Sequence, residues 1–166
     1  MKSFFAVLLT VFMLDTTFGV RRFRVFDYNR YGSRVRTWEQ ARAACRKLGR
    51  GWDLVKIDDR AEDNAIKTIL MQECTPDEHD GWFIGGKSIN GRWRWADYSR
   101  MTYSNFPLTY ISSVGLTGRG RPQSTVVRYA VIFKRNFQWG SVNARQRSGM
   151  GYICEIQCSD HFFPVP

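Results

Sequence analysis

The sequence predicts a domain of the α+β class, and three features of the chain support this prediction. Two segments in the first half of the 166-residue chain repeat apolar residues at helical spacing. An aromatic hairpin is expected at Gly81–Trp95, and three strand-like segments follow it. Two helices followed by mainly antiparallel strands are typical of the α+β class.

Both predicted helices begin with a capping pattern. Thr37 precedes Gln40 by three residues, and Asp59 precedes Glu62 by the same interval. The apolar face of the first helix consists of Trp38, Ala41, Cys45 and Leu48. The second helix is expected to end near Cys74. Its expected buried face consists of Ala65, Ile66, Ile69 and Leu70.

The hairpin is expected to form the middle of the core. An apolar run, Trp82–Ile84, is closed by two glycines, and Asn90-Gly91 supplies the positive φ values that a type I′ turn needs. After this turn, Trp93 and Trp95 alternate with arginines, so both tryptophans point to one face. Together with Trp139, these tryptophans are interpreted as core residues rather than as a platform for sugar stacking.

The remaining strands are expected on either side of this hairpin. Their predicted ranges are Arg21–Tyr31, Leu54–Ile57, Ser124–Phe133, Phe137–Val142 and Gly149–Ile156, with a turn at Lys134–Asn136. Thr102–Gln123 has no clean period and contains several glycines and prolines, so it is expected to be a long loop. Loops of this length inside a compact domain are usually functional or mobile.

The first residues have the pattern of a secretory signal. Lys2 precedes the apolar run Phe4–Met13, which is shorter than the roughly 20 residues that a membrane span requires. Small residues at the spacing of a cleavage site follow. We therefore expect a signal peptide at residues 1–19, a single domain at 20–166, no transmembrane segment and a secreted, extracellular protein. A buried N-terminal helix is the alternative, which the abrupt change to Arg21-Arg22 disfavours.

Four cysteines, an even number, predict two disulfides in an oxidising compartment. They are Cys45, Cys74, Cys154 and Cys158, and their spacing alone leaves three pairings open. A zinc site is the weaker alternative. The chain has no Cys-x-x-Cys pair, and its two histidines are near no matching ligand.

The formal net charge of +10 is concentrated in the second half of the chain. Between Gly81 and Ile153 the sequence contains eleven basic residues and only one acidic residue, Asp97. Most of these basic residues are arginines, whose planar guanidinium groups match sulfate, phosphate and carboxylate. A solvated surface that keeps the protein soluble is the alternative interpretation.

Several motifs occur in the order and spacing of the C-type lectin-like domain family, which the chain therefore resembles. These motifs are TWEQARAAC, DLVKI, GWFIGG, WRWAD, FQWGSV and GYICE. The resemblance covers residues 22–157 and implies two helices, two small antiparallel sheets and a long loop region. It also implies a disulfide between Cys45 and Cys154.

The chain departs from this family at two sets of positions. Ala130 and Ala144 stand where the family usually has a second disulfide, which leaves Cys74 and Cys158 to pair with each other. Sugar-binding members also hold calcium through Glu-Pro-Asn or Gln-Pro-Asp and Trp-Asn-Asp motifs. Here the corresponding residues are Asn105-Phe106-Pro107 and Trp139-Gly140-Ser141. Calcium needs 6–8 oxygen ligands, several of them charged, and these residues include no carboxylate. We therefore expect no metal, and no cofactor is expected either.

The expected binding residues are basic and fall on the long loop and the strands behind it, where this family binds ligands. They are Arg119, Arg121, Arg128, Lys134, Arg135, Arg145 and Arg147. No catalytic residue is predicted, because neither a hydrolase triad nor a pair of catalytic carboxylates can be placed. Nucleic acid is a poor partner for a secreted chain.

These observations favour a secreted, calcium-independent, non-enzymatic binding protein. Its expected partner is a sulfated or acidic glycan, a glycoprotein or a mineral surface, bound by the basic long-loop face. Two alternatives remain open: a basic matrix protein of a biomineral, and a cationic lytic protein that acts on microbes or egg coats. The sequence predicts neither the ligand's identity nor the oligomeric state.

Overall fold

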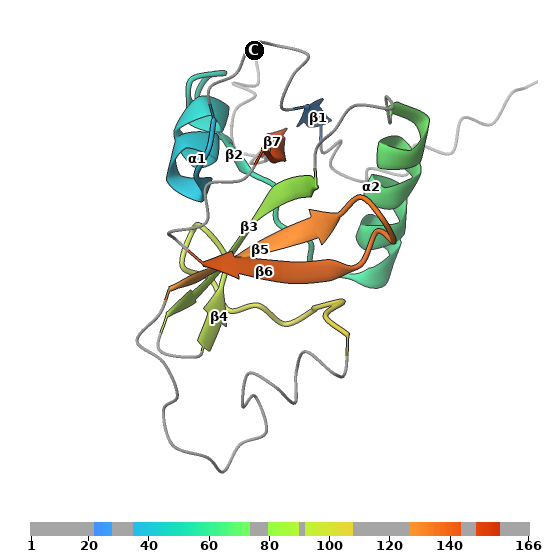
Figure 1. The fold of residues 1–166 in the computed structure, drawn as a ribbon. Coiled ribbons are helices and arrows are strands. Elements are labelled where there is room, and N and C mark those ends of the chain that lie inside the picture. Colours follow the sequence, from blue (N-terminus) through green and yellow to red (C-terminus); the bar gives the residue numbers. More distant parts are fainter. Residues whose placement is uncertain are drawn as a thin grey trace, which may run out of the picture.

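The chain forms two helices and seven strands within the residues that the computed structural model describes, which are 22–27, 35–73, 80–89, 92–107, 127–143 and 149–156. In chain order these elements are β1 Arg22–Phe26, α1 Trp38–Arg46, β2 Trp52–Leu54, α2 Arg60–Glu73, β3 Gly81–Ile89, β4 Arg92–Arg94, β5 Arg128–Phe133, β6 Trp139–Asn143 and β7 Gly151–Ile156. The predicted α+β class is confirmed. Figure 1 shows α1 and α2 on either side of the strands.

The strands form two antiparallel groups. In the first group β1 and β2 both pair with β7, and in the second β4 and β5 pair with β3 while β6 pairs with β5. A short parallel pairing joins the groups, with Trp82 opposite Gly151 and Phe83 opposite Tyr152. The two groups therefore make one hydrogen-bonded sheet, in which β3 and β7 are the central strands.

Both helices begin where the capping patterns predicted. The hydroxyl of Thr37 accepts a hydrogen bond of 3.3 Å from the backbone N–H of Gln40. At α2, the carboxylate of Asp59 accepts one of 2.8 Å from the N–H of Glu62, whose own carboxylate accepts another of 2.8 Å from the N–H of Asp58. These contacts satisfy backbone donors that the first turn of a helix leaves unpaired.

Every predicted strand has somewhat different limits in the structure, and two of these differences have a clear physical cause. The strand that begins at Gly81 does not end at the two glycines but continues through them to Ile89. Gly85 donates a hydrogen bond of 2.8 Å to the carbonyl of Val55, at a distance that leaves no room for a side chain. Val55 itself donates one of 2.9 Å to Ile153. The segment after Leu54 is therefore held between two strands instead of extending β2.

The aromatic centre of the core is confirmed. Trp82, Trp95 and Trp139 are each at most 2% exposed, whereas Trp93 is half-buried. On α2, Ile66 and Leu70 are buried as expected and Ile69 is half-buried, but Ala65 is exposed. A carboxylate, Asp63, is buried instead, because it lies three residues before Ile66 and shares its helical face.

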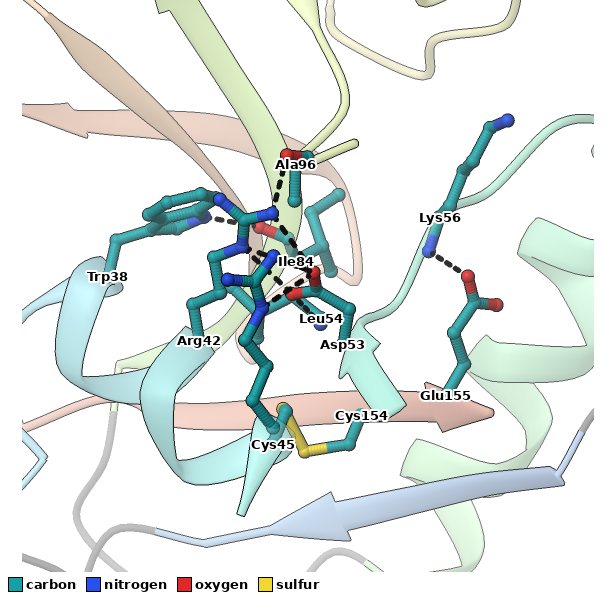
Figure 2. Close-up of polar contacts among 11 residues, drawn as sticks. Trp38, Arg42, Cys45, Asp53, Leu54, Lys56, Ile84, Ala96, Cys154 and Glu155 are labelled. Carbon is teal, nitrogen blue, oxygen red and sulfur yellow. Dashed lines mark hydrogen bonds and ion pairs between the residues drawn. A yellow bond between two sulfur atoms is a disulfide. The ribbon is translucent and has the colours of Figure 1, made fainter. Parts of the chain in front are cut away.

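A disulfide joins Cys45 on α1 to Cys154 on β7, across 109 residues of sequence (Figure 2). This pairing is the one that the family resemblance implied. The other two cysteines, Cys74 and Cys158, lie outside the described residues, as do the predicted signal peptide and the Asn90-Gly91 turn. Within the described part of the chain, no helix is long and apolar enough to span a membrane.

Candidate functional site

Three of the seven predicted binding residues lie in the described part of the chain. Arg128 begins β5 and approaches the hydroxyl of Ser141 on β6 at 3.5 Å. Lys134 and Arg135 form the turn after β5, where the Arg135 guanidinium lies 5.5 Å from the centre of the Phe133 ring. Since β5 separates these positions by about 20 Å, the structure does not bring Arg128 together with the other two. The remaining four, which lie outside the described residues, are Arg119, Arg121, Arg145 and Arg147.

Arg128 lies at the end of the sheet where the β3–β4 hairpin turns. Ser88 on β3 is opposite Arg128 on one side and opposite Trp93 of β4 on the other. Because neighbouring strands are about 4.8 Å apart, Arg128 and Trp93 are separated by about 10 Å. The basic residues of β4 and the first residue of β5 therefore share one end of the sheet.

Three further arginines, which are not among the predicted binding residues, gather at this end. Arg92 and Arg94 flank Trp93 on β4, and an antiparallel bridge pairs Arg94 with Arg100. The turn between them depends on Tyr98, which has a φ of 68° and donates its N–H to the carbonyl of Trp95 at 2.9 Å. The alternation of Arg and Trp after the hairpin turn was the available signal.

These arginines line a cavity of about 520 Å³ together with aromatic residues. Its aromatic lining consists of Trp93 and Phe106, whose ring centres are 4.8 Å apart. Ser104 contributes a hydroxyl. Among the described residues, no carboxylate lines this cavity, and none forms an ion pair with its three arginines.

The basic residues of α1 are placed differently, because they are engaged in holding the fold. Arg42 donates to both oxygens of Asp53, at 3.0 and 3.2 Å through Nε, and to the carbonyl of Ala96 at 2.6 Å. Figure 2 shows Arg42 between these two partners. Arg46 bonds to the same carboxylate at 3.1 Å. Substitution of Arg42 would therefore disturb the fold as well as remove a charge.

A buried carboxylate fixes the residues that lead into the long loop. Asp63 is 1% exposed, and one of its oxygens accepts a hydrogen bond of 2.9 Å from the indole of Trp139. Its other oxygen accepts from Asn105 at 2.9 Å, Tyr103 at 3.2 Å and Lys67 at 2.7 Å. Burial, followed by the charge of Asp63 and this hydrogen bond, raises the pKa of Tyr103. Asp63 thus joins α2, β6 and the start of the loop.

The positions that hold calcium in sugar-binding relatives are occupied by other contacts. Asn105 bonds to Asp63, and Phe106 is only 6% exposed and meets Trp139 edge-on at 5.6 Å. A side chain at Gly140 would collide with the ring of Phe133. Across the described ranges, no group of three or more His, Cys, Asp or Glu side chains could hold a metal ion. The residues at these positions do not fit calcium.

A family model described as "Lectin C-type domain" matches residues 34–156 of this chain. The chain therefore belongs to the C-type lectin domain family, as the sequence motifs predicted. Domains of this family are generally binding modules rather than enzymes. Among curated proteins, the chain is similar to Dromaiocalcin-1 of Dromaius novaehollandiae, with 34% identity over 67 residues. This match covers 40% of the chain and 47% of Dromaiocalcin-1, or about half of that protein.

Solved structures share the fold over most of the chain. The C-type lectin CEL-I from Cucumaria echinata has a TM-score of 0.61 at 17% identity, covering 85% of this chain and 93% of CEL-I. Human lithostathine has a TM-score of 0.61 at 16% identity, with 83% and 84% covered. Ovocleidin-17, described as a major protein of the eggshell calcified layer of Gallus gallus, has a TM-score of 0.57 at 22% identity, with 82% and 91% covered. At these identities, the similarity shows a common fold.

Proposed function

We propose that the protein is a secreted, calcium-independent binding protein that recognises an anionic partner, such as a sulfated or acidic glycan or glycoprotein. The observation that carries this proposal is the gathering of Arg92, Arg94, Arg100 and Arg128 at one end of the sheet. Charge of one sign on a surface attracts ligands of the opposite sign. The predicted basic residues of the long loop, Arg119 and Arg121, would add to the same attraction.

Calcium independence is proposed because the carboxylate oxygens nearest the loop, those of Asp63, already accept hydrogen bonds from the protein. The Asp63 carboxylate accepts four protein donors, and Asn105 is one of them. Calcium would have to break these contacts before it could gain the same oxygens. Secretion is supported by the N-terminal signal pattern and by the Cys45–Cys154 disulfide, since disulfides persist in oxidising compartments.

Heparin binding by the purified protein tests this proposal. Attraction between exposed charges is screened over about 8 Å at physiological salt, so binding should weaken steeply as salt rises. The double variant Arg119→Gln/Arg121→Gln should elute from a heparin column at lower salt than the control Arg36→Gln/Lys47→Gln. The control removes the same charge at exposed residues around α1. If both double variants lost the same heparin affinity, or if binding did not depend on salt, the proposal of a binding site at this face would be overturned.

A mineral surface is the second candidate partner. Ovocleidin-17, which shares the fold, is described as a protein of a calcified layer, and a carbonate surface presents anions to a basic face. Adsorption to calcium carbonate crystals in the presence of excess heparin distinguishes the two partners. Adsorption that heparin does not reduce would favour the mineral, whereas loss of adsorption would favour the glycan.

A further inference from the structure

We propose that the cavity beside β4 binds one anionic sugar unit, with its sulfate or carboxylate group among Arg92, Arg94 and Arg100 and its ring against Trp93 and Phe106. This inference rests on the proposed function and names the place and the unit that are recognised. The predicted long-loop arginines would then attract the polymer, while this cavity would select a single residue of it. Of the predicted binding residues, the three that the structure describes, Arg128, Lys134 and Arg135, do not line the cavity.

The charge of the cavity is unbalanced, which distinguishes it from a second cavity, of about 430 Å³, beside β2. The described lining of that cavity has three basic and three acidic side chains, which are Arg46, Arg50, Lys56, Asp53, Asp97 and Glu155. The described lining of the cavity beside β4 has three guanidinium groups and no carboxylate. Guanidinium groups bind oxyanions through paired N–H donors, so this cavity suits a sulfate or carboxylate.

Backbone contacts position two of the arginines, Arg94 and Arg100, before any ligand binds. The bridge between Arg94 and Arg100 places them directly opposite each other, and residues opposite one another in an antiparallel pair project to the same face. Arg94 also donates a hydrogen bond of 2.9 Å to the carbonyl of Tyr98. A site that is already arranged loses less conformational entropy on binding.

The aromatic wall suits the body of a sugar ring. Phe106 is buried between Trp93, at 4.8 Å between ring centres, and Trp139, at 5.6 Å. Trp93 is half-buried, so part of its surface remains open. Its indole nitrogen is buried and has no hydrogen-bond partner in the described part of the chain. Ligand sites typically combine apolar walls with a few placed polar groups, as this cavity does.

The volume limits the ligand to a small unit. Sites for small molecules have volumes of about 300–1,000 Å³, and this cavity, at about 520 Å³, is in the lower half of that range. It accommodates one or two sugar residues rather than a folded partner. The proposed unit is therefore a monosaccharide carrying one oxyanion, at the end of a glycan or within it.

The probe for this inference is N-acetylglucosamine carrying one sulfate ester, titrated into the folded protein. The indole N–H signal of Trp93, identified by its loss in Trp93→Phe, should shift during the titration in an NMR spectrum. The double variant Arg92→Gln/Arg100→Gln should bind at least about tenfold more weakly, since hydrogen bonds to charged groups are among the stronger ones. Arg36→Gln/Lys47→Gln should bind as the wild type does. Arg94 is left intact because it holds the Tyr98 turn.

Three further probes separate the parts of the proposal. Unsulfated N-acetylglucosamine should bind much more weakly, and equal binding would overturn the role of the arginines. Titration with glucuronate in place of the sulfated sugar shows whether the arginines bind a carboxylate more tightly or less tightly than a sulfate. Trp93→Leu should weaken binding of the sulfated sugar but not of inorganic sulfate, with a melting curve to confirm folding. Equal weakening of both would overturn the aromatic part.

The heparin experiment makes failure of this inference distinct from failure of the proposed function. If the wild type binds heparin while the sulfated sugar leaves the Trp93 signal unmoved, the cavity is not the site and the proposed function stands. If the wild type binds no heparin but binds the sulfated sugar, and only Arg92→Gln/Arg100→Gln loses that binding, the cavity site stands without the polymer. If neither ligand binds, both proposals are overturned.

Discussion

The carboxylate of Asp63 accepts a 2.9 Å hydrogen bond from the indole nitrogen of Trp139, which lies 76 residues further along the chain. The same carboxylate accepts hydrogen bonds from Tyr103, Asn105 and Lys67. One side chain on α2 therefore connects a helix, a central aromatic residue and the first residues of the long loop.

Asp63→Ala should lower the free energy of unfolding by about 3–5 kcal/mol, because it leaves four donors without their acceptor, among them the ammonium of Lys67 and the buried indole of Trp139. Asp59→Ala is the control, since it removes a carboxylate that only caps α2 and should cost about 1 kcal/mol. Urea denaturation of both variants measures the difference. Equal losses would show that Asp63 acts only as a charge near the helix start.

Calcium should leave the stability of the protein unchanged. A ligand that binds only the folded state raises the melting temperature, so melting in calcium should match melting in chelator. The variant Gly140→Asn/Ser141→Asp restores the Asn-Asp pair of sugar-binding relatives, yet it should gain no calcium dependence, because Phe133 occupies the space beside residue 140. A clear rise in the melting temperature with calcium, in either protein, would contradict the prediction.

Removal of the Cys45–Cys154 disulfide should destabilise the fold strongly. The bond closes a loop of 109 residues, which in the chain-entropy model stabilises the folded state by about 4–5 kcal/mol. The double variant Cys45→Ala/Cys154→Ala avoids a free thiol and should unfold at a correspondingly lower denaturant concentration. An unfolding midpoint equal to that of the wild type would refute this contribution.

Peptide mapping without reduction should find Cys74 joined to Cys158. This pairing is expected because Cys45 and Cys154 are already bonded to each other. A fragment in which Cys45 is joined to Cys74 would contradict it. The mapping needs no substitution, so it is independent of the stability measurement.

Stability should fall at alkaline pH through Tyr129. Burial, followed by the hydrogen bond to Glu39 and its charge, raises the pKa of Tyr129 well above its usual value. The folded state therefore keeps a proton that the unfolded state releases above a pH of about 10. The stabilisation is present below that pH and is lost as the pH rises towards the folded pKa.

Unfolding measured between pH 8 and about 11 tests this prediction. Tyr129→Phe should be less stable than the wild type at neutral pH but should lose less stability as the pH rises. Tyr98→Phe is the control, because Tyr98 is 68% exposed, and it should keep the slope of the wild type. If the stability of Tyr129→Phe fell with pH as steeply as that of the wild type, Tyr129 would not be the cause of the alkaline loss.

The fold could be predicted where neighbouring residues determine it. The caps at Thr37 and Asp59 and the Arg-Trp alternation after the hairpin are local patterns, and the structure contains both helix starts and the hairpin. The role of Asp63 could not be predicted in this way, because its donors lie up to 76 residues away in the sequence. The only local signal for its burial is spacing, because Asp63 lies on the same helical face as Ile66 and Leu70, which are buried.

The cavity beside β4 could not be predicted for a related reason. Arg100 joins Arg94 only because the chain reverses at Tyr98, a residue that adopts a left-handed φ without being glycine. Asp97 is a common turn residue and accepts a hydrogen bond of 2.8 Å from the N–H of Ser99, but this local signal does not specify that Arg100 lies opposite Arg94. Phe106 reaches Trp93 from a segment that has no regular period. The basic character of the region could therefore be read from the sequence, but the arrangement that makes a cavity could not.

The position of β7 has a consequence for biosynthesis. β1, β2 and β3 all pair with β7, so the sheet stays incomplete until the ribosome has passed residue 156. At ordinary rates of translation, Cys45 precedes Cys154 by about 5 to 20 s, during which Cys74 is the nearer thiol. We expect early oxidation to join Cys45 to Cys74, so that reaching the native bond requires thiol exchange. Expression in a host with an active disulfide isomerase should therefore raise the yield of native protein.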